Sequence, residues 1–385
     1  MKIQRSTRPA LLGAALLLAA CGGEGEKTVD AQAAAGDSAA AAGPAAAAEA
    51  PAPAPTTDPG PKTELPPNEL GEIMVLEYHR LGQNEGEWVR KPENFRKDLQ
   101  SLYERGFRPV TMRQVVEGDI DIPAGTTPVV FTIDDSSLGQ FYYLPDGNID
   151  PNTMVGMWAD FQGRNPGWKN GGVWCVLPAA DHPSNFFGEK PSREVPRAER
   201  EATIKKKVTY LVENGHEICN HTLYHARLDR AKSDAQVQEW LGRGEDSIRV
   251  YLPEGYDIVT HALPLGMWPK NRQLAWQGSW NGKPYEYKVV LEVSGGPNVS
   301  PYDVKWNGHS VNRFIVAPGA LERQLQAYER NPARRYVSDG NPNTISVPEG
   351  QESRVDRSRW SGKTVRAVAP AAGQPASAAP AAGTP

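Results

Sequence analysis

The chain has 385 residues, with 46 acidic and 42 basic side chains, a net charge of −4 and a pI near 6.0. Because there is no basic field and no long run of Lys or Arg, this composition argues against nucleic acid as a partner. The stretch 70–350 suits one large α/β domain, and we expect a single folded unit there.

The first twenty residues are typical of a secretory signal, with an Arg-containing start, an apolar run and small residues before Cys21. The apolar run is too short to cross a bilayer. The segment "LLAAC" resembles the lipobox of bacterial lipoproteins, in which the cysteine becomes lipidated after cleavage. An ordinary cleaved signal is the alternative. We therefore expect a signal peptide at 1–20 and an extracytoplasmic lipoprotein, at the outer membrane or the periplasmic face in a Gram-negative cell.

Two segments have a composition that cannot bury enough apolar surface to offset the entropy of ordering them. Residues 21–69 are rich in Ala and Pro and are expected to be a disordered linker, and 351–385 are expected to be a disordered tail. The remaining cysteines, Cys175 and Cys219, lie in the folded part. In an oxidising compartment they form either one disulfide or two buried thiols.

Strands and helices are predicted to alternate along the folded part. An apolar strand at 73–76 leads to His79, and a buried strand at 128–133 ends in two aspartates. Apolar residues at helical spacing predict a helix between these strands, near 92–105. Further helices are expected near 152–166, 204–215 and 237–248, and further strands near 173–177, 218 and 256–263. This alternation indicates a mainly parallel sheet.

His221 and His225 are four residues apart in "ENGHEICNHTLYH". If the chain is helical from Asn220 onward, both imidazoles project from one face and can reach one ion. This spacing arises often by chance. The alternative is a solvated helix start that is capped by Asn220 or Thr222.

Asp134 and Asp135 follow a different buried strand, where parallel α/β folds place their sites. Buried carboxylates are costly without a counter-charge, and a divalent cation would supply one. The alternative is that one aspartate caps the next turn and the other is solvated. One Asp and two His suit a catalytic zinc ion with an open position, and the other carboxylate is then free to act as a base. Such a site fits the hydrolysis of an amide.

The segments "VVFTIDDSS", "NGHEICNHTLYH" and "HALPLGMWP" resemble, in this order, the motifs of the polysaccharide deacetylase family, the NodB-homology domain of carbohydrate esterase family 4. The opening "VLEYHRLG" resembles the subgroup that acts on N-acetylglucosamine polymers. The resemblance spans 73 to about 269. It implies a distorted (β/α) barrel as a single catalytic domain, and metal-dependent N-deacetylation of a glycan.

Carried over by position, the resemblance implies that Asp134 is the catalytic base. It implies a divalent metal, with zinc expected and cobalt, nickel or iron as alternatives. The implied metal ligands are Asp135, His221 and His225. Pro264 and Gly266 match the loop that borders the acetyl pocket.

The sequence departs from the family pattern at four places, of which Ile133 in place of Phe is only a packing change. Ser136 replaces a glycine whose backbone conformation can be costly for serine, and Ala262 replaces an arginine that usually orients the base. The histidine acid of the last motif has no clear match. His309 is the nearest candidate, with a surface loop as the alternative, and Arg313 could instead steady the base.

His79 and His261 are at predicted strand ends, and we expect them to be pocket-wall or core residues, with His79 a candidate for substrate binding. The predicted function is removal of N-acetyl groups, by cleavage of linear amide C–N bonds, from an N-acetylglucosamine-containing glycan of peptidoglycan or exopolysaccharide type. The alternatives are an O-acetyl esterase and a degenerate, glycan-binding surface lipoprotein. The sequence does not indicate an oligomeric state.

Overall fold

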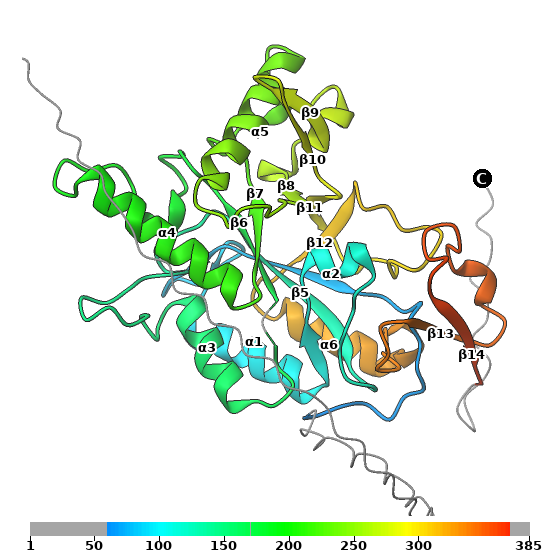
Figure 1. The fold of residues 1–385 in the computed structure, drawn as a ribbon. Helices are drawn as coiled ribbons and strands as arrows, with labels where there is room; N and C mark the ends of the chain where they lie inside the picture. The colour runs from blue at the N-terminus through cyan, green and yellow to red at the C-terminus, as the bar shows by residue number, and fades with distance from the viewer. Residues whose placement is uncertain (1–59, 170, 370–385) are drawn as a thin grey trace, which may run out of the picture. The chain divides into compact units, whose positions relative to one another are not determined.

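Seven parallel strands close into a barrel in the computed structural model, which describes residues 60–169 and 171–369 (Figure 1). In their order around the barrel they are β1 (Met74–Tyr78), β5 (Thr127–Ile133), β6 (Gly172–Val176), β7 (Glu217–Asn220), β8 (Thr260–Ala262), β11 (Val289–Gly295) and β12 (Val311–Ile315). The ring closes because β1 pairs with both β12 and β5. An eighth strand, β4 (Phe107–Pro109), pairs with the start of β5. The predicted (β/α) barrel is confirmed.

The barrel is distorted where its strands are short or shifted. Strands β7 and β8 pair through a single residue couple, Asn220 with His261, and the register between β11 and β12 shifts after Leu291. In contrast, all seven residues of β5 are buried, as the unbroken apolar run at 128–133 predicts. The well-formed strands β1 and β5 therefore provide a rigid base for the residues that follow them.

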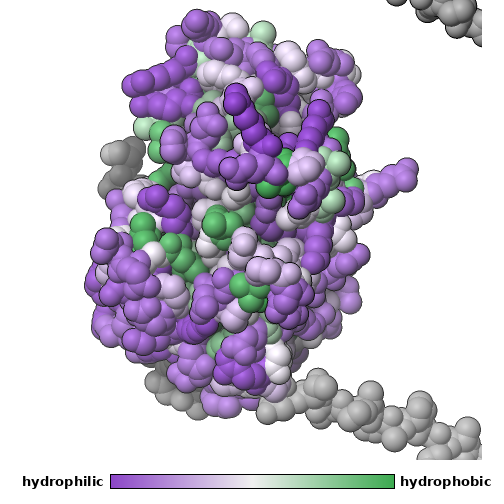
Figure 2. All heavy atoms as spheres, turned by 90° about the vertical axis from the view of Figure 1, so that its left-hand side faces the viewer, coloured by the Kyte–Doolittle hydropathy of each residue, from purple (hydrophilic) through white to green (hydrophobic). Residues whose placement is uncertain are grey.

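The helices lie outside the strands (Figure 1). They are α1 (Pro92–Glu104), α2 (Met112–Glu117), α3 (Met154–Arg164), α4 (Arg197–Glu213), α5 (Asp234–Arg249) and α6 (Ala320–Arg330). Helix α1 buries Phe95, Leu99 and Leu102, the apolar face expected from the sequence. Among the described residues, none of the helices combines the length and apolar character that a membrane span requires. The face drawn in Figure 2 is mostly hydrophilic, with apolar side chains in small separate patches.

Two of the three two-stranded sheets in the described part of the chain lie next to barrel strands in the sequence. The hairpin β9 (Gln277–Trp280) and β10 (Lys283–Glu286) turns at Asn281 and Gly282, a residue pair typical of two-residue hairpin turns. Strands β2 (Arg80–Leu81) and β3 (Val89–Arg90) pair just after β1. Both pairs are insertions in the loops between barrel elements.

The folded part extends beyond both boundaries that we predicted. At the C-terminal end, β13 (Thr344–Pro348) pairs with β14 (Thr364–Val368), and the Trp360 side chain is buried and donates to the Pro301 carbonyl. At the N-terminal end, Glu69 is buried and Asn68 bridges to Val337. Residues 351–369 and 60–69 therefore belong to the domain. The signal segment, Cys21 and the rest of the two low-complexity segments lie outside the described residues.

Candidate metal centre and active site

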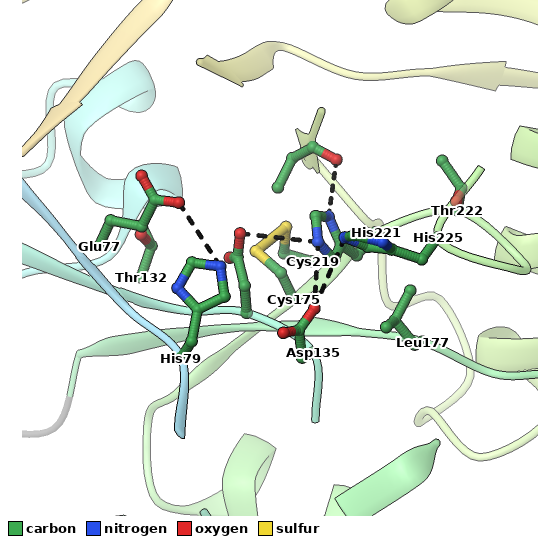
Figure 3. Close-up of polar contacts among 12 residues, drawn as sticks. Glu77, His79, Thr132, Asp135, Cys175, Leu177, Cys219, His221, Thr222 and His225 are labelled. Atoms are coloured by element: carbon green, nitrogen blue, oxygen red, sulfur yellow. Dashed lines mark hydrogen bonds and ion pairs between the residues drawn. A yellow bond between two sulfur atoms is a disulfide. The ribbon is translucent and has the colours of Figure 1, made fainter. Parts of the chain in front are cut away.

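The predicted site residues come from the carboxyl ends of three barrel strands and from the middle of a fourth strand. Asp134 and Asp135 follow β5, His221 follows β7, and His79 follows β1, while Arg313 lies on β12. Parallel strands present their carboxyl ends at one rim of a barrel, which is where such folds place their chemistry. Figure 3 shows Asp135, His221, His225 and His79 together at this rim.

Three of these side chains converge as a ligand set. The Asp135 Oδ1 atom lies 3.6 Å from His221 Nε2 and 3.7 Å from His225 Nε2. Both distances are too long for a hydrogen bond. They are close to the separation of about 3.3–3.6 Å between two ligands that each lie about 2.0–2.2 Å from one zinc ion. The three residues that the sequence singled out as ligands are therefore brought together (Figure 3).

The buried polar atoms of this cluster fit a cation. Asp135 Oδ1 and His221 Nε2 are buried and form no hydrogen bond with the described residues. Burial lowers the pKa of His221, but the Asp134 and Asp135 carboxylates outweigh it, so the net shift is upward. Two orphaned buried atoms in a negative field are costly, and a divalent ion would satisfy both. The residues present thus suit a divalent metal with Asp and His ligands.

The imidazole tautomers also suit metal binding. His221 Nδ1 lies 2.9 Å from the Ala262 carbonyl oxygen, so Nδ1 carries the proton and Nε2 presents its lone pair to the cluster. Burial and the neighbouring His221 lower the pKa of His225 to about 4, which keeps its imidazole neutral. At position 262, where the family pattern has an arginine, the backbone carbonyl orients a ligand.

The two histidines lie on a loop, so the predicted helical turn was wrong. Residues 221–227 form no helix, and both Thr222 (φ 68°) and His225 (φ 55°) adopt left-handed backbone conformations. The Asn220 Oδ1 atom accepts from the Thr222 N–H, and Thr222 Oγ1 accepts from the Ala226 N–H. These side chains compete with the helical ladder for the backbone donors.

The turn after β5 is strained and is held by hydrogen bonds. Asp135 (φ 76°) and Ser136 (φ 45°) both lie in the left-handed region. The Ser136 hydroxyl accepts from the Leu177 N–H at 3.2 Å, and its carbonyl accepts from the Phe187 N–H at 2.6 Å. Position 136 thus needs the conformation that glycine adopts readily, and the contact of its hydroxyl with Leu177 stabilises serine there.

Asp134 is held as a carboxylate by Arg313. Arg313 Nη1 lies 2.9 Å from Oδ1 and 2.8 Å from Oδ2 of Asp134, and both side chains are buried. Burial raises the pKa of Asp134, but Arg313, His221 and His79 outweigh it and lower the pKa to about 2. Arg313 therefore orients the predicted base, which is the role that the sequence suggested for it.

Glu77 is a functional candidate that the sequence analysis missed. It lies within the buried strand β1, and its Oε1 atom is 3.1 Å from Arg313 Nη2 and 3.7 Å from His79 Nε2. Burial raises the pKa of Glu77 to about 8. An acid inside the apolar run "IMVLEYH" was the available signal, because an unpaired carboxyl rarely occupies a buried strand. Arg313 thus joins Glu77 to Asp134.

The position of His79 favours it over His309 as a proton donor. A nitrogen of His79 and carboxylate oxygens of Glu77 and Asp134 all lie within 4.8 Å of one another. The His79 side chain is 13% exposed and packs edge-on against Trp88. His309 stacks instead on Trp276, with a ring separation of 4.6 Å. Its electrostatic neighbours are Tyr287, Glu286 and Arg359, none of which belongs to the cluster.

One side chain fixes the backbone between the base and His79. The buried Gln140 Nε2 donates to the Asp134 carbonyl at 2.5 Å and to the His79 carbonyl at 2.6 Å. This amide bridges the ends of β5 and β1. The separation of the two candidate acid–base groups is therefore set by a buried contact.

Pro264 and Gly266 form a short turn (Pro264–Gly266) after β8, next to the Ala262 carbonyl that orients His221. Leu265 and Gly266 have left-handed φ values of 57° and 65°, and a Cβ atom on Gly266 would approach the Val293 side chain at 3.1 Å. The turn thus lies at the same rim as the cluster. His261 is a core residue, fully buried with Nδ1 2.8 Å from the Ala275 carbonyl oxygen.

Cys175 and Cys219 form a disulfide. They are directly opposite each other on the neighbouring strands β6 and β7, and both are buried. Of the two alternatives left open by the sequence, the disulfide is the one observed. It ties the end of β7, from which His221 follows, to the adjacent strand (Figure 3).

No protein-family profile and no curated protein sequence matches this chain. Solved structures do resemble it. They include a deacetylase and a polysaccharide deacetylase. The deacetylase PplD of Streptococcus pyogenes, in complex with acetate, is 17% identical with a TM-score of 0.47, and the match covers 66% of this chain and 97% of PplD.

Two further structures show a similar relationship. IcaB from Ammonifex degensii is 16% identical with a TM-score of 0.45, over 69% of this chain and 97% of IcaB. A polysaccharide deacetylase from Bacillus cereus is 15% identical with a TM-score of 0.45, over 66% of this chain and 68% of that protein. At these identities the likeness concerns the fold.

Proposed function

We propose that this protein is a metal-dependent hydrolase that removes N-acetyl groups from an N-acetylglucosamine-containing glycan. The observation that carries the proposal is the convergence of the buried Asp135 and His221 with the partly buried His225 beside a separate carboxylate, Asp134, that Arg313 keeps ionised. A ligand set with a free base next to it suits hydrolysis of an acyl group. The motifs that resemble those of polysaccharide deacetylases favour an acetyl group on a sugar.

The proposed ligands are Asp135, His221 and His225, and zinc is the expected ion. When bound, such an ion polarises a carbonyl group and lowers the pKa of water. Asp134 is ionised at neutral pH, so it can accept a proton from the attacking water. Arg313 keeps that carboxylate fixed in orientation. In the overall reaction, water adds to the amide carbonyl, the C–N bond breaks, and acetate and an amine leave.

The leaving amine needs a proton, and His79 is the group we assign to it. Its imidazole lies beside Asp134 and Glu77 and remains partly accessible. Asp134 and His79 are thus neighbours on the rim. The proton that Asp134 takes from water can pass to the imidazole and from there to the leaving nitrogen, so both residues return to their starting state. In this proposal Glu77 lies beside the imidazole and positions Arg313, which in turn orients the base.

The test is acetate release by purified protein from matched sugars. N-acetylglucosamine oligomers, with metal content measured in parallel, should give acetate and stoichiometric zinc or a related ion. Release from O-acetylated sugars alone would instead support the esterase alternative. Glycan binding without any acetate release, in the presence of added zinc or cobalt, would support a degenerate binding protein.

We also propose that the protein is anchored outside the cytoplasm through a lipid on Cys21, with peptidoglycan or an exopolysaccharide as substrate. The support is the "LLAAC" segment and the Ala/Pro-rich stretch after it. Labelling of cells with a fatty-acid analogue should mark the protein. A Cys21→Ala variant should lose the label, and a labelled variant would contradict the proposal.

A further inference from the structure

A buried chain of hydrogen-bonded side chains connects the loop that carries His221 and His225 to the outer helix α5 and holds the loop in place. The loop has no regular backbone ladder, and Thr222 and His225 have left-handed conformations. Strain of this kind persists only where the surroundings hold it. The positions of His221 and His225 therefore depend on side-chain hydrogen bonds from outside the loop.

Asn220 is the first link of this chain. It is fully buried at the end of β7, and its Oδ1 atom accepts from the Thr222 N–H at 2.9 Å. Its Nδ2 atom donates to the Leu241 carbonyl at 3.1 Å and to the Tyr287 hydroxyl at 2.7 Å. Because Nδ2 is bound to Leu241 and Tyr287, Oδ1 faces the loop and keeps Thr222 in its left-handed conformation.

Tyr287 and Glu245 are the second and third links. The Tyr287 hydroxyl donates to Glu245 Oε2 at 2.8 Å, so its single proton is used and its oxygen must accept from Asn220. Glu245 belongs to α5, is 5% exposed, and accepts from Arg249 Nε at 2.8 Å. Donor and acceptor are therefore fixed at each hydrogen bond between Glu245 on α5, Tyr287 and Asn220.

Helix α5 packs closely against the loop because Gly244 has no side chain. A Cβ atom on Gly244 would lie 2.9 Å from Asn220 Oδ1 and 3.0 Å from the Leu223 nitrogen. The Leu223 N–H also donates to the Trp240 carbonyl of the same helix at 3.1 Å. The loop is therefore seated directly on α5.

We propose that Tyr287 is a positioning residue for the metal centre, acting through Asn220 on the loop that carries His221 and His225. This inference rests on the proposed function, since it assumes that those histidines bind a metal ion. Groups that orient ligands without touching the ion commonly change metal affinity on the order of tenfold or more when they are removed. Tyr287→Phe, which removes only the hydroxyl, should therefore weaken metal binding by a factor of that order.

The chain offers a matched control in Tyr285. It is also buried, its ring stacks on Tyr287, and its hydroxyl donates to the Leu274 carbonyl at 2.8 Å, away from the loop. Tyr285→Phe removes the same atom and leaves a buried acceptor unpaired, as Tyr287→Phe does. A general loosening of the fold would affect both variants alike.

The experiment measures the zinc dissociation constant of the full-length, disulfide-intact protein by competition with a chromophoric chelator, together with the thermal unfolding midpoint. We expect at least tenfold weaker binding by Tyr287→Phe and a change of less than about twofold by Tyr285→Phe. Glu245→Gln, which keeps an acceptor for the tyrosine hydroxyl, should bind more tightly than Tyr287→Phe. Equal affinities of the two phenylalanine variants would overturn the inference. Absence of zinc binding by the unmodified protein would instead overturn the proposed function.

Discussion

Arg313 binds both carboxylate oxygens of Asp134 through one nitrogen, at 2.9 and 2.8 Å, although the two residues are 179 positions apart. Its second terminal nitrogen lies 3.1 Å from Glu77. One buried guanidinium thus contacts two buried acidic side chains, on β1 and at the end of β5. The orientation of the proposed base depends on a residue from the last strand of the barrel.

Replacement of Arg313 by methionine should be strongly damaging. The change leaves the Asp134 carboxylate buried without its counter-charge, and breaking a buried pair in this way costs about 3–5 kcal/mol of folding free energy. Deacetylation should also fall, because the pKa of Asp134 rises and its orientation is lost. Chemical denaturation and acetate release measure the two effects. As the control, Arg164→Met removes an exposed ion pair with Asp160 and should change little. An Arg313→Met variant as stable as Arg164→Met would refute the assignment.

Asp134 and His221 should have separable roles. Asp134→Asn should keep the metal but lose roughly a hundredfold to ten-thousandfold in kcat, because the amide cannot accept the proton from water. His221→Ala should lose both metal and activity. Metal content by atomic spectroscopy and acetate release distinguish these results. Asp229→Asn, which breaks only the partly exposed pair with Arg227, serves as the matched control. Loss of metal in Asp134→Asn would show that the two aspartates have been assigned the wrong way round.

His79 and His309 give a direct test of the proton donor. His79→Ala should lower kcat about a hundredfold or more, because the leaving amine loses its acid. His309→Ala should leave kcat nearly unchanged, since His309 stacks on Trp276 away from the cluster. Steady-state kinetics on an N-acetylglucosamine oligomer measures both. The reverse ranking of the two variants would restore His309 as the acid.

Glu69 should make the protein less stable in alkali. The side chain is buried near Asp339, and burial followed by this neighbour raises its pKa from 4.5 to about 8. The folded state then holds a proton that the unfolded state releases, so the stabilisation is complete below about pH 4.5 and is lost as the pH rises towards about 8. A shift of this size corresponds to a few kcal/mol, on the order of 1.4 kcal/mol per pKa unit.

Glu69→Gln removes this ionisation, so the variant should unfold at a higher temperature than the unmodified protein at pH 9, with a much smaller difference at pH 5. Thermal unfolding followed by circular dichroism between these pH values measures the effect. Glu93→Gln, an exposed change in the first turn of α1, provides the control. Parallel pH profiles for Glu69→Gln and the unmodified protein would contradict the expectation.

The sequence by itself determined the parts of the fold and site that depend on near neighbours. The buried run at 128–133, the amphipathic pattern of α1 and the Asn281-Gly282 turn were all visible as local patterns, and each element formed. Local patterns were less informative at the chain ends. Val355 and Trp360 are isolated apolar residues in a polar stretch, so the burial that extends the domain past 350 was not evident.

Tertiary structure decided how the site is completed. Closure of the barrel places Arg313 in contact with both Glu77 and the proposed base, and it brings His79 rather than His309 to the cluster. Side-chain hydrogen bonds from Asn220 and Thr222 replaced the helical turn expected at His221. The physical reason is the separation along the sequence between the residues that interact. Spacing along the chain fixes which residues share a strand or a turn, whereas the partners of a buried charge come from whichever strands the closed sheet makes adjacent.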